Sequence, residues 1–298
     1  MTDSSTAQHI NDQGQTNWYT RLDPRVRRVV AFLGVLATLV LLWELYKVVA
    51  KALDVTSPVR PDNRTMPHSW DIIWALFQPV RRGGELLIVT LTKASLFTLG
   101  EALLGFVIGA VVGFTLGVLF VRSELAERAF MPYVVASQTV PILAIAPMVV
   151  IWGAQLGMGQ QLRVGLIAAY ITFFPVAINT LRGLRSPDPT AMELMRSYAA
   201  SGRAVLWKLQ VPSALPYIFT ALKVSATASV VGAIIGELPT GTRSGLGRAL
   251  LDFSQQFGAR PEKLYAAVLM SALAGILFVG LITLLEHRVV HAARRQPA

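Results

Sequence analysis

Residues 86–121 read LLIVTLTKASLFTLGEALLGFVIGAVVGFTLGVLFV. Lys93 and Glu101 are the only charged residues in this stretch. A helix crosses the hydrocarbon core of a bilayer with about 20 apolar residues, so the stretch is too long for one perpendicular span. It predicts a tilted or broken membrane helix, and it places the chain among proteins whose helices lie in lipid.

The composition of the whole chain agrees with this class. Of its 298 residues, 53% are hydrophobic and 15% are charged, whereas soluble domains have about 25% charged residues. The formal net charge is +10, but the basic residues lie mostly between apolar runs, which disfavours nucleic-acid binding. The chain has no cysteine, which excludes disulfides, thiolate metal sites and catalytic thiols.

Further apolar runs predict an all-α membrane protein with six transmembrane helices. Besides 86–121, the expected crossings are residues 29–50, 129–152, 163–182, 214–238 and 263–285. The 129–152 run is interrupted by Pro132, Pro141 and Pro147. Residues 51–85 and 239–261 are expected to be loops, the first with a short surface helix around Ser69–Phe77.

The first apolar run has two interpretations. Ala50-Lys51-Ala52 resembles a signal-peptide cleavage site, but the polar lead and the apolar run are both too long for a signal peptide. An uncleaved helix is therefore favoured. Glu44 and Lys47 lie one turn apart near its far end, and we expect them to pair with each other.

Lys and Arg are slightly more frequent on the side of the membrane that holds the two ends of the chain, which favours cytoplasmic termini. We therefore expect a cytoplasmic tail at residues 1–28, one membrane domain at residues 29–290 and a cytoplasmic tail at residues 291–298. The polar loop 183–212 then also faces the cytoplasm.

Two patterns within the spans are structural candidates. One helix face carries four glycines, Gly105, Gly109, Gly113 and Gly117, whose missing side chains allow another helix to pack closely. We expect that helix to belong to the same subunit, in preference to a neighbouring subunit. Prolines within spans free backbone carbonyls, which are tolerated only against protein or water. They predict either simple kinks or bends that face a solute pathway, which would be lined by Ser137, Gln138, Thr139 and Pro141.

The loop 183–212 reads GLRSPDPTAMELMRSYAASGRAVLWKLQVP. Its prolines and Thr190 are suited to begin a helix over Ala191–Ala200, which Ser201-Gly202 would end or bend. A second short helix, Arg203–Gln210, is expected to lead into the next span. Two rigid helices in a loop predict contact with another protein.

The same segment resembles the cytoplasmic "EAA" motif of ATP-binding-cassette (ABC) importer permeases. That motif reads Glu-Ala-Ala, three residues, Gly, nine residues, Ile-x-Leu-Pro, and Glu193 and Pro212 stand at its spacing. The chain departs from it at four sites that carry small or apolar residues: Leu194-Met195, Ala199, Leu209 and Val211. Further strings are similar to permeases for nitrate, sulfonates, taurine and pyrimidine precursors: Ser137–Trp152, Phe173-Phe174-Pro175, Gly183–Ser186, Gly236-Glu237 and Gly245-Leu246-Gly247.

This resemblance implies a type I ABC importer permease fold in the bacterial cytoplasmic membrane. It implies a homodimeric pore, two ABC ATPase subunits and an extracytoplasmic solute-binding protein as partners. Glu237 is also implied to make a structural or gating hydrogen bond and to belong to the solute pathway. The residues implied to contact the ATPase are Glu193, Met195, Ala199, Gly202, Leu209 and Pro212. The sequence has no G-x-x-x-x-G-K-[ST], so we expect ATP on the partner and no cofactor on this chain.

The main alternative is an ion-coupled secondary transporter, which needs ionisable groups at mid-membrane. Glu101 and Lys223 are the best candidates, and such groups are scarce in the spans. An enzyme is disfavoured because neither G-x-S-x-G nor H-E-x-x-H occurs. His287 and His291 are interpreted as part of a basic anchor at the lipid headgroups, so no metal site is expected.

Overall fold

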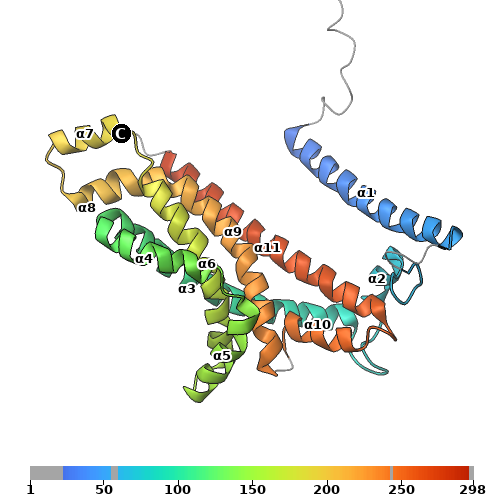
Figure 1. Cartoon of the computed structure of the whole chain (residues 1–298). Coiled ribbons are helices and arrows are strands. Elements are labelled where there is room, and N and C mark those ends of the chain that lie inside the picture. Colours follow the sequence, from blue (N-terminus) through green and yellow to red (C-terminus); the bar gives the residue numbers. More distant parts are fainter. Residues whose placement is uncertain (1–22, 55–59, 242–243, 295–298) are drawn as a thin grey trace, which may run out of the picture. The chain divides into compact units, whose positions relative to one another are not determined.

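The computed structural model describes residues 23–54, 60–241 and 244–294. Every named element in these ranges is helical, which confirms the expected all-α class (Figure 1). The elements are α1 (Pro24–Ala52), α2 (Ser69–Ala75), α3 (Leu87–Arg122), α4 (Glu124–Ser137), α5 (Ile142–Gln155), α6 (Gln160–Leu184), α7 (Pro189–Ser197), α8 (Gly202–Val205), the π-helical turn η2 (Leu206–Gln210), α9 (Val211–Glu237), the 3-10 turn η3 (Leu238–Thr240), α10 (Leu246–Gln255) and α11 (Pro261–Arg294). Of the two expected tails, residues 1–22 and 295–298 lie outside the described residues.

The chain divides into two compact units, Met1–Asp71 and Ile72–Ala298. Within the first unit, the Glu44 carboxylate on α1 accepts hydrogen bonds of 2.8 Å from the backbone N–H and the hydroxyl of Ser69. His68 Nδ1 lies 2.7 Å from the same carboxylate. The predicted pair of Glu44 with Lys47 is therefore wrong, because the following loop brings other donors back to the carboxylate.

Within the described residues, five helices are long and apolar enough to cross a membrane, and a bent pair of helices brings the number to six if it counts as one span. The number of crossings expected from the sequence is thus confirmed when the pair is counted as one span. The five are α1, α3, α6, α11 and the run from α8 through α9. Residues 86–121, expected to be a tilted or broken helix, lie almost entirely in one 36-residue helix, α3, which has no break.

The bent pair corrects the expected single span at residues 129–152. Its halves, α4 and α5, meet at 98° across a break of four residues. At the break, the N–H groups of Gln138 and Thr139 close a tight turn, and Pro141 precedes α5 with extended backbone. Proline has no N–H to continue a helix. Pro132 and Pro147 remain inside helices, so Pro141 alone coincides with the break.

The core of the second unit is the contact of α6 with α3 on one side and α9 on the other. A methyl group added at Gly109 of α3 would lie 2.6 Å from Thr172 Cβ and 2.8 Å from the Ala169 carbonyl oxygen on α6. One added at Gly232 of α9 would lie 2.8 Å from Ala168 Cα. Small residues let these backbones approach. The four-residue glycine repeat therefore serves packing within the subunit, as expected.

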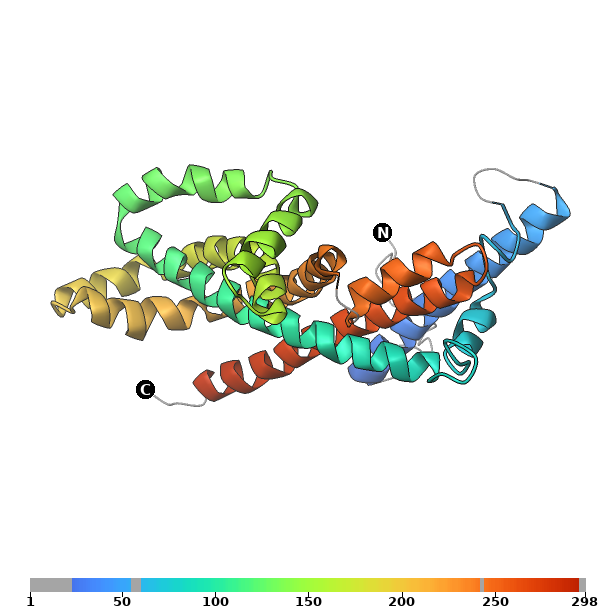
Figure 2. The same ribbon diagram turned by 90° about the horizontal axis from the view of Figure 1, so that it is seen from below.

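The interval 239–261, expected to be a loop, contains α10. Leu246 and Phe253 of this helix are buried with Leu87 and Leu91 of α3 and Ala266 of α11. Figures 1 and 2 show α10 near the start of α3, away from the end of the second unit that carries α7 and α8.

Candidate functional site

Segment 183–212 forms two helical arms joined by a tight turn. The first arm, α7, begins at Asp188, whose carboxylate oxygen accepts a 2.7 Å hydrogen bond from the N–H of Thr190. Asp188 is therefore the N-cap, and the expectation that Thr190 caps the helix is wrong. Aspartate is a strong N-cap residue, and Pro189 at the first helical position has no N–H that needs a partner.

The turn between the arms is a Schellman motif, in which a left-handed residue follows the helix. Ala199 occupies that position with φ of 48°. Its N–H donates to the Arg196 carbonyl, and the N–H of Ala200 donates to the Met195 carbonyl. The predicted stop at Ser201-Gly202 is thus two residues late. Ser201 instead caps the second arm by accepting the N–H of Ala204 at 3.3 Å.

Ala199→Gly tests this geometry. A left-handed residue with a Cβ costs about 1–2 kcal/mol relative to glycine, so we expect the variant to raise the unfolding free energy by about 1 kcal/mol. Ala200→Gly is the matched control and should lower it, because Ala200 does not have a positive φ and glycine costs more chain entropy. Thermal unfolding of the purified chain measures both, and equal shifts of one sign would contradict the turn.

The second arm is continuous with the next span, whereas a separate short helix, Arg203–Gln210, was expected. α8 passes through η2 directly into α9, and the N–H of Val211 donates to the Leu206 carbonyl five residues back. This wide turn lies just before Pro212, whose ring is incompatible with a regular α-helical turn. Leu206 is buried with Leu184 and Ala214, which fixes the base of the arm.

The outer surface of segment 183–212 is exposed and partly apolar. Leu194 on α7 and Tyr198, which follows the helix directly, are 55% and 77% exposed, and Trp207 on the second arm is 54% exposed. Of the residues predicted to contact a partner, Glu193, Ala199, Gly202 and Pro212 are exposed, while Met195 and Leu209 are half-buried. Both arms lie at one end of the second unit (Figures 1 and 2).

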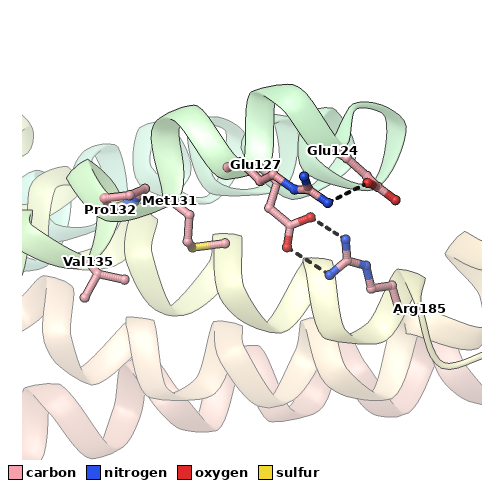
Figure 3. A pocket seen from close by; sticks show the side chains of 7 residues that line it. Glu124, Glu127, Met131, Pro132, Val135 and Arg185 are labelled. Carbon is pink, nitrogen blue, oxygen red and sulfur yellow. Dashed lines mark hydrogen bonds and ion pairs between the residues drawn. The ribbon is translucent and has the colours of Figure 1, made fainter.

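An ion pair joins segment 183–212 to α4. The Arg185 guanidinium donates to both carboxylate oxygens of Glu127, with Nη1–Oε1 at 2.9 Å and Nη2 bonded to Oε2 (Figure 3). These hydrogen bonds to Glu127 raise the pKa of Arg185 above its ordinary value. The pair borders an open cavity of about 700 Å³ lined by Glu124, Glu127, Arg128, Met131, Pro132, Val135 and Arg185. The sequence alone did not indicate the ion pair, because 58 residues separate Arg185 from Glu127.

Charge reversal tests whether this pair holds segment 183–212 against α4. Arg185→Glu places a carboxylate against Glu127, so we expect the free energy of unfolding to fall by about 1 kcal/mol, the upper end for a partly exposed pair. The double variant Arg185→Glu with Glu127→Arg should recover most of that loss. Thermal unfolding of the purified chain measures the effect, and a double variant as unstable as the single one would contradict the pairing.

The residues predicted to line a pathway fall in two places. Ser137, Gln138, Thr139 and Pro141 form the break between α4 and α5, and the last three are exposed. The Tyr170 hydroxyl of α6 donates to the Ser137 carbonyl and ties the break to the core. Glu237 lies elsewhere: it is fully buried and accepts 2.5 Å hydrogen bonds from the Thr98 hydroxyl and the Gly247 N–H.

The two candidates for ion coupling differ in their surroundings. Lys223 on α9 is paired with Glu286 on α11, with Nζ and Oε2 2.9 Å apart. Its charge is thus compensated within the chain. Glu101 on α3 is fully buried and accepts a 3.2 Å hydrogen bond from Gln160.

Comparison with known proteins gives a consistent result. Residues 105–291 match the family described as "Binding-protein-dependent transport system inner membrane component". The formylaminopyrimidine transport permease protein ThiX of Halalkalibacterium halodurans is 33% identical over 199 residues, which cover 67% of this chain and 77% of that protein. The riboflavin transport system permease protein RibX of Chloroflexus aurantiacus is 30% identical over 273 residues, covering 88% and 96%.

A solved structure of the MetNI methionine ABC transporter, in an inward-facing conformation, resembles the fold. The TM-score is 0.56 at 18% identity, over 69% of this chain and 97% of the matched chain. A chain from an amino acid ABC transporter gives a TM-score of 0.55 at 18% identity, over 67% of this chain and 94% of the other. The fold is therefore the type I importer fold that the sequence motifs predicted.

Proposed function

The chain belongs to the inner membrane components of binding-protein-dependent transport systems, and we propose that it forms the solute pathway of an ATP-driven importer. It is a multi-pass membrane permease component and not an enzyme. In the proposed assembly, two copies of the chain form the pore, two ABC ATPase subunits bind at the cytoplasmic side, and an extracytoplasmic binding protein delivers the solute.

The observation that carries this proposal is the form of segment 183–212. Its arms are rigidly capped and fixed at the base by Leu206, yet their outer surface is left exposed with Leu194, Tyr198 and Trp207. Exposed aromatic and aliphatic side chains on a rigid support are suited to bury in a protein cleft. In this proposal the ATPase supplies that cleft, and its movement on binding and hydrolysing ATP is transmitted through α9 and through the Arg185–Glu127 pair.

The proposed orientation places this end of the second unit in the cytoplasm. Arg122, Arg182, Arg185, Arg196, Arg203 and Lys208 lie on or beside segment 183–212 or at the adjoining end of α3. Basic residues near span ends favour the cytoplasmic side. Both termini are then cytoplasmic, while α10 and the start of α3 face the opposite side.

We propose that the solute is a small, water-soluble organic or inorganic compound, with a pyrimidine or vitamin precursor preferred. Among the relatives are permeases whose names state the transported solute: formylaminopyrimidine, riboflavin, aliphatic sulfonates, taurine and nitrate. The preference rests on ThiX, which is 33% identical, and on RibX, whose match covers 88% of this chain, whereas the sulfonate permease SsuC of Bacillus subtilis is 32% identical over 64% of it.

Co-expression with a candidate ATPase and a candidate binding protein, sought in the neighbouring reading frames, tests the proposal. The chain is expected to co-purify with two ATPase subunits. Solute uptake by proteoliposomes should require ATP on the side of the membrane where the ATPase lies and the binding protein on the opposite side. Uptake that persists without the ATPase and follows a proton or sodium gradient would favour the ion-coupled alternative and contradict the proposal.

A further inference from the structure

Two carboxyl groups meet inside the second unit. Glu101 is on α3 and Glu237 is at the end of α9, both are completely buried, and their carboxyl groups are close enough to interact. Two buried carboxylates side by side repel each other when both are ionised, and neither then has a donor for the other. We therefore expect one of the two to carry a proton.

The surrounding donors identify which one. Glu237 receives two hydrogen bonds, one at each oxygen, from the Thr98 hydroxyl and the Gly247 N–H, both at 2.5 Å. These donors stabilise its ionised form. Glu101 receives one longer bond from Gln160, at 3.2 Å, and no described residue donates to its buried Oε2. Oε2 is thus the oxygen that can hold a proton.

No cation offsets the two groups within the described part of the chain. The groups that face them are Thr98 from α3, Gln160 from α6 and the backbone of Gly247 from α10, and all three are uncharged. In such surroundings, two carboxyl groups sharing one site retain one proton. We propose that Glu101 is a neutral carboxylic acid that donates its proton to Glu237, and that it is the positioning residue for the start of α10.

Glu237 and Thr98 together hold the start of α10 on α3. The Thr98 hydroxyl accepts the N–H of Leu246 at 2.8 Å while it donates to Glu237. Gly245 has φ of 101° and packs on the Glu237 carboxyl, so a side chain there would overlap it. With its proton in place, Glu101 allows the Glu237 carboxylate to remain in this site without a second buried charge beside it.

Glu101→Gln separates this role from simple packing. The glutamine amide can donate to Glu237 as the acid does, but it cannot lose the proton. In the wild type, the unfolded chain loses this proton at lower pH than the folded chain does, so the free energy of unfolding should fall as pH rises until the folded chain has lost the proton too. In Glu101→Gln the same fall should be absent. Glu101→Ala has no donor and should be unstable at every pH.

The experiment uses the purified full-length chain in detergent. Infrared spectroscopy should show the carbonyl band of a protonated, buried carboxyl group in the wild type, and that band should be missing in Glu101→Gln. Thermal unfolding between neutral and alkaline pH should show a falling midpoint for the wild type and a level one for Glu101→Gln. An infrared band that is unchanged in Glu101→Gln, or parallel pH profiles, would overturn the assignment.

A role of Glu101 in transport rests on the proposed function. A second measurement, of uptake, distinguishes failure of the proposed function from failure of the proposal for Glu101. In proteoliposomes with the partner proteins, Glu101→Gln should retain at least about half of wild-type uptake at neutral pH and exceed the wild type at alkaline pH. Failure of the wild type itself to transport would count against the proposed function, while the infrared and unfolding results would still decide the protonation of Glu101. An uptake by Glu101→Gln as low as that of Glu101→Ala would count against the positioning role.

Discussion

Replacing Glu193 by arginine is expected to lower ATP-driven uptake by at least about tenfold while the protein stays folded in the membrane. Glu193 is exposed on α7, on a helix with no buried residue, so its substitution does not disturb the core. If α7 lies in an ATPase cleft, the reversed charge enters a surface complementary to a carboxylate. A mismatched charge at an interface costs several kcal/mol, and each 1.4 kcal/mol is a factor of about ten.

Three measurements distinguish lost coupling from lost folding. Co-purification with the ATPase should fall together with uptake, and ATP hydrolysis should no longer respond to the solute-loaded binding protein. The unfolding midpoint of the isolated chain should stay the same as that of the wild type. Glu193→Gln, which removes the charge without reversing it, should give an intermediate loss. Wild-type uptake by Glu193→Arg would place the ATPase contact elsewhere.

The same substitution at two glycines of α3 should destabilise the protein at one and leave it almost unchanged at the other. Gly109→Ala places a methyl group 2.6 Å from Thr172 Cβ and 2.8 Å from a backbone carbonyl of α6. Backbone cannot move aside as a flexible side chain can, so the α3–α6 contact must open, at a cost of about 3 kcal/mol. At Gly100, which is exposed, a methyl group would meet nothing within 4 Å. Gly100→Ala should therefore be neutral or slightly stabilising, since alanine favours helix.

Thermal unfolding in detergent and the yield of monodisperse protein measure this difference. Gly109→Ala is expected to unfold at a clearly lower temperature, with part of the protein aggregated, while Gly100→Ala resembles the wild type. Similar behaviour of the two variants would show that α3 and α6 do not approach as closely as described. Because the test needs neither solute nor partner, it examines the fold independently of the function.

The sequence predicted those features that depend on local pattern. Apolar length is a property of each segment by itself, so the five long membrane helices were all expected, and the bent pair lies where a sixth crossing was expected. The four-residue glycine repeat of α3 likewise identified a packing face before its partner α6 was known. The spacing of Glu193 and Pro212 pointed to segment 183–212 and to a family whose fold the structure shares.

Features that depend on tertiary contact were missed. The interval with α10 looked like a loop because its glycines and polar residues outweigh a short apolar stripe, and burial of Leu246 and Phe253 against α3 and α11 stabilises the helix. The 98° bend between α4 and α5 was also missed, since three prolines offered three possible breaks. Glu44 found partners 24 and 25 residues away, which spacing on one helix cannot reveal.

In the proposed assembly, segment 183–212 faces the cytoplasm, where an ATPase can bind it. The chain has no cysteine, so a single Glu193→Cys variant reports its own accessibility to a membrane-impermeant maleimide. Ser254→Cys, exposed on α10, is the matched control for the other side. We predict that Glu193→Cys reacts in inside-out vesicles and Ser254→Cys in right-side-out vesicles. Labelling of Glu193→Cys in sealed right-side-out vesicles would contradict the account.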